Sequence, residues 1–299
     1  MQNLNGIVMV VAAMAAFTLE DTFIKLLSAD FAISQILFGI GLGGAVVFAA
    51  IATAQRRSLF APLAWTRFPL LRALSEMLAA LAFVTALSRV DISIVAAVFQ
   101  ATPLAITLGA ALFFREQVGW RRWCAILLGF LGVLMIIRPG FDDFNPASLY
   151  VLLTVVTIAA RDLLTRKVPG DVASSIVSFQ GFASLVVVGV LMRITLPDME
   201  FRAMDQGAGL LLLGAVIFGT LGYYGIVTAM RVADASAVTP FRYTRLVFSL
   251  IVGMVVFQER PDLWTLLGAG LIIATGLYTF LRERKLALEI ANRRGTRRD

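Results

Sequence analysis

Long apolar stretches follow one another along almost the whole chain, and short polar segments separate them. An α-helix needs about 20 mostly apolar residues to cross the hydrocarbon core of a bilayer. Stretches of about that length occupy residues 4–27, 32–54, 68–89, 92–114, 121–138, 147–167, 172–193, 207–230, 235–257 and 262–281. The pattern predicts an all-α integral membrane protein with ten transmembrane helices. The short connections favour antiparallel packing of consecutive helices.

Two parts of this pattern repeat at a constant spacing along the chain. The first copy contains Thr85, Ala86, Asp91, Ser93, Val95, Phe114 and Glu116, and the second contains Thr228, Ala229, Asp234, Ser236, Val238, Phe257 and Glu259. An odd number of predicted helices separates the copies, so the second copy lies inverted in the membrane. We expect two inverted five-helix repeats, at 1–140 and 141–281, followed by a basic cytoplasmic tail at 282–299. Carriers built from inverted repeats hold their substrate between the repeats, near the bilayer midplane.

The repeated polar residues stand at the ends of predicted helices. Asp91 and Asp234 are each followed two residues later by serine, and they come where a short polar side chain can cap free N–H groups. Glu116 and Glu259 close the same helices, and we interpret them as interfacial anchors. We therefore expect these residues to serve the architecture and not the binding of substrate.

Composition narrows the class further. Charged residues make up only 15% of the chain, against about 25% in soluble domains, so we expect no soluble domain beside the helices. Most Lys and Arg residues fall in alternate connections and in the tail, which predicts that both termini are cytoplasmic. Topology then accounts for the net charge of +7 without nucleic-acid binding. The chain has no histidine and no phosphate-loop motif, so we expect neither an enzyme nor a bound metal or cofactor.

Several polar residues lie inside the predicted helices, where a charge costs at least about 2.5–3.5 kcal/mol. We predict that the substrate-binding residues are Glu20, Asp21, Glu76, Phe99, Gln100, Arg242, Tyr243 and Arg245. A zwitterionic substrate needs a buried guanidinium for its carboxylate and a carboxylate for its ammonium group, and this set offers both. The aromatic residues that could line an apolar part of the site are Phe17, Phe83, Phe99, Tyr223, Tyr224 and Tyr243.

Structural ion pairs are the alternative interpretation of the same charges. Arg242 or Arg245 could pair with an acidic side chain of another helix, among Glu20, Asp21, Glu76 and Asp162. Two local pairs are also expected at a spacing of four residues, which places both members on one helix face: Asp21 with Lys25, and Arg72 with Glu76. Arg161 is close to a predicted helix end, and we expect its side chain to reach the membrane interface.

Two prolines interrupt predicted helices. Pro103 lies midway along the stretch 92–114, and Pro240 lies in the stretch 235–257 close to Arg242. Proline removes one helical hydrogen bond, which membrane helices tolerate where neighbours or a cavity satisfy the freed carbonyl. We predict hinge or gating roles for Pro103, Pro240 and Asp162. A kink without functional consequence is the alternative.

The segments 92–140 and 235–285 each combine a proline-containing helix with a short loop that carries glutamate. This pair resembles the repeat of the EamA-type drug/metabolite transporter superfamily. The resemblance implies ten helices in two inverted five-helix units and transport of small metabolites. Within the superfamily the chain is similar to amino-acid exporters of the bacterial inner membrane, including the aromatic amino-acid exporter.

The expected function is therefore export of amino acids or related metabolites across the inner membrane by alternating access. An uptake or exchange carrier for a drug, a nucleotide sugar or an S-adenosylmethionine-like compound is the first alternative. A channel and an intramembrane enzyme are more distant ones, and the latter is disfavoured because the chain lacks histidine. The expected partners are a small-molecule substrate and the lipid bilayer, with the protein as a monomer or a weak dimer.

Overall fold

The computed structural model describes residues 2–115, 119–141, 144–196, 201–232 and 239–295, and these parts form helices joined by short connections, without a strand. The helices are α1 (Gln2–Leu27), α2 (Ile33–Ala54), α3 (Arg67–Leu87), α4 (Ile92–Phe99), α5 (Thr102–Phe114), α6 (Trp120–Ile137), α7 (Ser148–Thr165), α8 (Ser174–Thr195), α9 (Gln206–Val232), α11 (Thr244–Val256) and α12 (Leu263–Gly295). Two short 3₁₀ helices are η1 (Pro62–Trp65) and η2 (Thr239–Tyr243). The predicted all-α class is confirmed.

Within the described ranges, nine helical segments are long and apolar enough to cross a membrane, with α4 and α5 together forming one of them. The predicted tenth stretch, 235–257, corresponds to η2 and α11. Its first residues, 235–238, lie outside the described residues, as do the repeated residues Asp234, Ser236 and Glu116.

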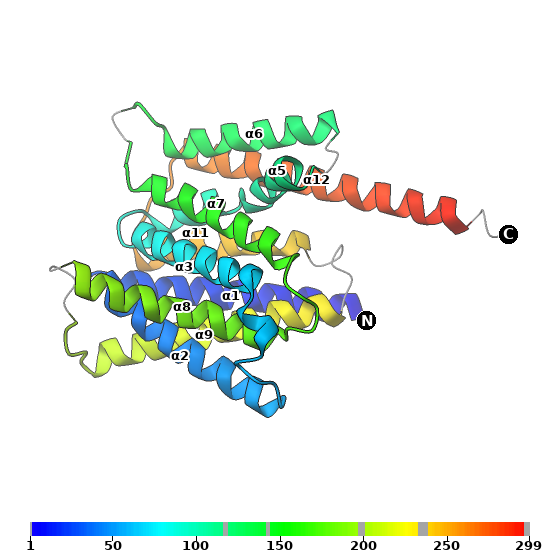
Figure 1. Cartoon of the computed structure of the whole chain (residues 1–299). Helices are drawn as coiled ribbons and strands as arrows, with labels where there is room; N and C mark the ends of the chain where they lie inside the picture. The colour runs from blue at the N-terminus through cyan, green and yellow to red at the C-terminus, as the bar shows by residue number, and fades with distance from the viewer. Residues whose placement is uncertain (1, 116–118, 142–143, 197–200, 233–238, 296–299) are drawn as a thin grey trace.

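The two predicted repeats interlock across the bundle. The most extensive helix pairs are α1 with α9, α2 with α8, α3 with α7 and α6 with α12, and each joins one helix of the first repeat to one of the second. The pair α6 and α12 packs side by side at the top of Figure 1. An interface between the repeats therefore runs through the whole molecule.

The helices run roughly antiparallel along the bundle (Figure 1). Helix α1 begins, and α12 ends, at the same end of the bundle (Figure 1), which we name the termini end. The opposite end, where α1 ends and α4 begins, is the far end. Outward-facing apolar side chains such as Phe113, Ile194 and Val255 are exposed, as a lipid-facing surface requires.

The predicted interruption at Pro103 is present in the structure. Helix α4 ends at Phe99 and α5 begins at Thr102, with Pro103 in the first turn of α5. The Thr102 hydroxyl donates to the Phe99 carbonyl at 2.6 Å and so satisfies a group at the break. In the second repeat, η2 contains Pro240 and precedes α11, and the Thr244 hydroxyl donates to the Phe241 carbonyl at 2.6 Å.

Helices α6 and α12 cross at two glycines. A Cβ atom added to Gly132 would lie 2.8 Å from the Gly268 carbonyl oxygen, and one added to Gly268 would lie 2.6 Å from the Gly132 carbonyl oxygen. Real Cβ contacts are not this short, so the two backbones touch only because both positions lack a side chain. Close packing through small residues is typical of membrane helices, where burial of apolar surface gives little driving force between helices.

Candidate functional site

A cavity of about 1180 Å³ lies between the repeats. Its walls include every predicted site residue, namely Glu20, Asp21, Glu76, Phe99, Gln100, Pro103, Asp162, Pro240, Arg242, Tyr243 and Arg245. These residues come from α1, α3, the break between α4 and α5, α7, η2 and α11. Residues far apart in the sequence are therefore gathered around a single space.

The cavity extends from the centre of the bundle towards the termini end. Its walls include Arg122 at the start of α6, Thr165 at the end of α7 and Ser174 at the start of α8, all at that end. Towards the far end, apolar residues of α3 and α4, among them Leu87 and Val95, close round a pocket with no room for a water molecule. Among the described residues, apolar packing therefore closes the cavity towards the far end.

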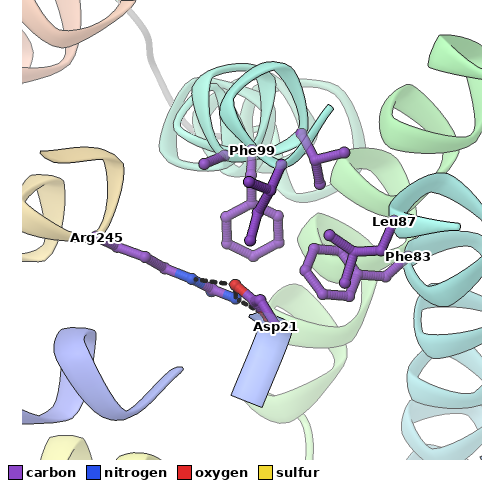
Figure 2. A pocket seen from close by; sticks show the side chains of 8 residues that line it. Asp21, Phe83, Leu87, Phe99 and Arg245 are labelled. Carbon is purple, nitrogen blue, oxygen red and sulfur yellow. Dashed lines mark hydrogen bonds and ion pairs between the residues drawn. The ribbon is translucent and has the colours of Figure 1, made fainter. Parts of the chain in front are cut away.

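Asp21 and Arg245 form a bidentate ion pair at the closed end of the cavity (Figure 2). Arg245 Nη2 lies 2.9 Å from Asp21 Oδ1 and 2.7 Å from Oδ2, and Arg245 Nε donates to Oδ2 at 3.2 Å. The side chains are 5% and 13% exposed, so the pair is largely out of water. The interpretation of Arg245 as a structural partner of an acidic residue is therefore confirmed, and the predicted pairing of Asp21 with Lys25 is wrong.

Three phenylalanine rings surround the Arg245 guanidinium. The distances from its carbon to the ring centroids are 5.3 Å for Phe17, 5.7 Å for Phe83 and 4.9 Å for Phe99. Figure 2 shows Phe83 and Phe99 beside the ion pair. Attraction between the cation and the ring faces adds to the ion pair, because little water competes for the guanidinium.

A second charged cluster lines the cavity on α3 and α7. Arg72 Nη2 lies 3.3 Å from Glu76 Oε2, which confirms the predicted local pair. Arg161 Nη1 lies 2.9 Å from Glu76 Oε1, and Arg161 Nη2 lies 2.8 Å from Asp162 Oδ1. The prediction that Arg161 reaches the membrane interface is therefore wrong, since two carboxylates hold it in the cavity wall. Arg72 also donates to the Thr165 hydroxyl at 3.2 Å.

Glu20 and Arg242 differ from these paired charges. Neither forms an ion pair or hydrogen bond through its side chain with another residue that the structure describes, although both line the cavity. Glu20 packs on α9 at Gly219, where an added Cβ would lie 2.4 Å from Glu20 Oε1. The Arg242 side chain is exposed. The cavity therefore presents one carboxylate and one guanidinium to a molecule that enters it.

The remaining candidates add polar and aromatic groups to the wall. Gln100 is 7% exposed, and its Nε2 has no hydrogen-bond partner among the described residues. Tyr243 lies against α12, where a Cβ at Gly276 would collide with its hydroxyl. Tyr223 lines the cavity, but Tyr224 is 61% exposed and does not, so its predicted place in the wall is wrong.

The predicted helix cap at Asp91 is also wrong. Asp91 stands at the N-cap position of α4 but forms no capping hydrogen bond through its side chain. Burial raises the pKa of Asp91, and the neighbouring Glu259 carboxylate raises it further. The group that caps α4 is Glu259 itself, which accepts hydrogen bonds from the Ile92 and Ser93 backbone N–H groups. The interpretation of Glu259 as an interfacial anchor is therefore wrong, because its side chain is buried against the start of α4.

The described part of the chain contains no cluster of side chains suited to bind a metal ion. No group of three or more Cys, Asp or Glu side chains lies close enough there to hold an ion. Glu76 and Asp21 are paired with Arg161 and Arg245, so Glu20 and Arg242 are the charges left for an organic molecule with charges of both signs.

Comparison with known proteins extends these observations. The model of the EamA-like transporter family matches residues 4–138 and 145–281. The S-adenosylmethionine uptake transporter of Rickettsia conorii is 31% identical over 61% of the chain and 61% of its own length. The riboflavin transporter of Vibrio cholerae is 34% identical over 63% of the chain and 62% of its own length. The chain thus matches both over about three fifths of their length.

Two further similarities cover more of the molecule. The riboflavin transporter of Rhizobium johnstonii is 30% identical over 74% of the chain and 73% of its own length. A solved crystal structure shares the fold with a TM-score of 0.61 and 17% identity, over 92% of this chain and 97% of that chain. The double family match and the shared fold agree with the helical architecture. The chain belongs to the EamA-like transporter family.

Proposed function

We propose that the protein is a secondary carrier that moves a zwitterionic metabolite by alternating access. One observation carries this proposal. Glu20 and Arg242 both line the cavity between the repeats, and neither forms an ion pair with another described residue. Arg242 would bind the carboxylate of the substrate, and Glu20 would bind its ammonium group. Such charge-assisted hydrogen bonds are stronger than neutral ones and need no rearrangement of the paired residues around Arg161 and Arg245.

The size and lining of the cavity favour a substrate larger than a simple amino acid. Pockets for drug-sized ligands measure about 300–1,000 Å³, and this cavity of about 1180 Å³ exceeds that range. Phe17, Phe99 and Tyr243 supply aromatic wall. S-adenosylmethionine joins an α-amino-acid group, which matches Arg242 and Glu20, to a sulfonium cation and a purine, which can both pack on the aromatic wall. We therefore propose an S-adenosylmethionine-like substrate. Such a compound has the same amino-acid group as the export substrate expected from the sequence, and the part attached to that group is larger.

Riboflavin is a second candidate, favoured by the 34% identity to the Vibrio cholerae riboflavin transporter. Its flat ring system fits the aromatic wall. Riboflavin has neither a carboxylate nor an ammonium group, so it would leave Glu20 and Arg242 without partners. Removing these charges should therefore weaken transport of S-adenosylmethionine and leave transport of riboflavin unchanged.

We further propose that the protein lies in a bacterial inner membrane with both termini cytoplasmic. The concentration of Lys and Arg in alternate connections and in the tail supports this orientation. In that orientation the cavity opens to the cytoplasm, and the structure represents an inward-open state. Transport would require the far end to open and the termini end to close, with direction set by the substrate gradient.

Counterflow into liposomes tests the proposal. Vesicles with the purified protein are loaded with unlabelled S-adenosylmethionine, methionine, phenylalanine or riboflavin, and uptake of the labelled compound is measured. We expect S-adenosylmethionine to show saturable counterflow. Loss of one charge-assisted hydrogen bond costs about 1.5–3 kcal/mol, so Glu20→Gln and Arg242→Gln should each raise KM about 10- to 100-fold. Arg57→Gln, in an exposed position before η1, is the matched control and should leave KM unchanged.

Counterflow of riboflavin alone, unaffected by Glu20→Gln and Arg242→Gln, would replace the proposed substrate by the second candidate. Movement of none of the four compounds would overturn the substrate assignment.

A further inference from the structure

A cluster of residues from both repeats joins α4 to α11 at the far end of the bundle. The Glu259 carboxylate, just after α11, accepts hydrogen bonds from the Ile92 N–H at 2.7 Å, the Ser93 N–H at 3.0 Å and the Ser93 hydroxyl at 2.6 Å. Lys25 Nζ lies 3.7 Å from Glu259 Oε1. We name Lys25, Ser93, Gly253 and Glu259 the far-end latch.

Lys25 extends the latch to the end of α3. Its ammonium group donates to the Val90 carbonyl at 2.6 Å and to the Leu87 carbonyl at 3.3 Å. It also lies 5.3 Å from the centre of the Phe257 ring. One cation therefore ties α1 to the connection between α3 and α4 and, through Glu259, to the end of α11.

The latch is protected from water. The side chains of Glu259 and Lys25 are only 4% and 16% exposed. The first N–H groups of a helix have no partner within it, and the positive end of the helix dipole attracts a carboxylate. Because Asp91 does not cap α4, a carboxylate from the opposite repeat completes the start of this helix. The contact is therefore strong and is formed entirely between the repeats.

Gly253 of α11 provides the space for this contact. A Cβ atom added there would lie 2.4 Å from Ser93 Oγ and 2.5 Å from Glu259 Oε2. A side chain there would force the Ser93 hydroxyl and the Glu259 carboxylate to move from these positions. Gln258 turns the chain with a left-handed φ of 55°, and the Glu259 N–H donates to the Gly253 carbonyl at 2.9 Å. The loop is thus folded back so that Glu259 meets α4.

The position of the latch connects it to transport. Ile92 and Leu87, which contact the latch, also line the closed apolar pocket beyond Asp21 and Arg245. Within the part of the chain that the structure describes, the cavity extends towards the termini end, where Arg122, Thr165 and Ser174 line it. If the carrier alternates its access, as proposed above, the far end must open, and α4 cannot leave α11 while Glu259 holds its N-terminus.

We propose that Glu259 is a positioning residue for transport, which keeps the far end closed by holding the start of α4 against α11 and Lys25. Release of Glu259 from the Ile92 and Ser93 N–H groups accompanies opening of the far end. Weakening the latch shifts the population towards a state open at the far end. A cap with a purely structural role would instead change stability and leave the side of access unchanged.

Thiol labelling distinguishes these roles without reference to any substrate. The single cysteine, Cys124, is replaced by serine, and Val95, which is 1% exposed in the closed pocket, is changed to cysteine as a reporter. An impermeant maleimide is applied separately to each side of oriented vesicles. Thermal unfolding in detergent confirms that each variant is folded.

Glu259→Gln removes the charge that faces Lys25 and one acceptor for α4. Loss of a hydrogen bond to a charged group should shift the equilibrium at least about tenfold, so the far-side labelling rate of the reporter should rise by about that factor. Gly253→Ala should act in the same direction by steric displacement. Matched controls are Asp30→Asn, at an exposed carboxylate of the far end, and Gly270→Ala, where an added Cβ meets nothing within 4 Å.

Unchanged far-side labelling in folded Glu259→Gln and Gly253→Ala would overturn the proposal, as would equal increases from both sides. If Glu259→Gln does not fold, Lys25→Gln takes its place with the same expected result. A failed substrate panel together with positive labelling would refute only the proposed substrate, so the two proposals can fail independently.

Discussion

Removing either member of the Asp21–Arg245 pair should destabilise the protein strongly. The pair joins α1 to α11 through three contacts of 2.7–3.2 Å, and both side chains are at least 87% buried. Breaking a buried ion pair by removing one partner costs about 3–5 kcal/mol, because the remaining charge is left without compensation. Asp21→Asn and Arg245→Met should each lose that much.

The double variant should be more stable than the sum of the two losses predicts. When both charges are absent, no uncompensated charge remains, so the coupling free energy of the double-mutant cycle should reach about 2 kcal/mol or more. Part of the loss in Arg245→Met comes from the three phenylalanine rings and should persist in the double variant. Arg245→Lys keeps the charge but cannot form the bidentate contact, so it should lie between the parent and Arg245→Met.

Reversible unfolding in mixed micelles, followed by helical circular dichroism, gives the four free energies of the cycle. Losses that add within about 0.5 kcal/mol would refute the reasoning, because independent sites behave in that way. Losses below about 1 kcal/mol would show that the pair behaves like one exposed to water.

Three further changes test other parts of the structure. Gly132→Ala should destabilise the α6–α12 crossing by about 1–3 kcal/mol in the same unfolding assay, whereas Gly270→Ala should have little effect. Arg161→Gln replaces the guanidinium that pairs with Glu76 by a neutral amide, so it should lower transport and stability together. Loss of transport at the stability of the parent protein would contradict a supporting role for Arg161. Partial burial raises the pKa of Asp262, but hydrogen bonds from Thr265 and the Arg138 guanidinium outweigh it and hold the pKa below its ordinary value. The stability from this group is present above about pH 3.9 and is lost as pH falls through its folded pKa, so Asp262→Asn should reduce the drop in melting temperature between pH 5 and pH 3.

The membrane class and the residues of the candidate site are both predictable from the sequence. Apolar runs of membrane-spanning length report directly on helices, because backbone groups in lipid must be satisfied within the segment. Charged residues in such runs are costly, so Glu20, Asp21, Arg242 and Arg245 were marked as candidates by position alone. All four line the same cavity.

The partners of these charges were harder to predict. Local spacing predicts a pair between Asp21 and Lys25, four residues away on the same helix, but Asp21 pairs with Arg245, 224 positions along the chain. Local spacing predicts only pairs within a helix, whereas the contact between α1 and α11 depends on how the repeats pack. Glu259 shows the same limit of local spacing. A sequence pattern can place Glu259 at the end of its own helix, but it cannot predict the contact with the first N–H groups of α4.

Substrate specificity was the least predictable feature. A zwitterion needs one charge of each sign, and many arrangements of Glu20, Glu76, Arg242 and Arg245 satisfy that requirement in a sequence. The structure distinguishes them, because Glu76 and Arg245 are held by partners while Glu20 and Arg242 have none among the described residues. That distinction is the physical basis of the proposed binding mode.

Counterflow of S-adenosylmethionine by the parent, Glu20→Gln and Arg242→Gln proteins in liposomes tests the central claim most directly. The account predicts saturable counterflow in the parent protein and a KM raised about 10- to 100-fold in each variant, with Arg57→Gln unchanged. A parent protein that exchanges S-adenosylmethionine with the same KM as both variants would contradict it.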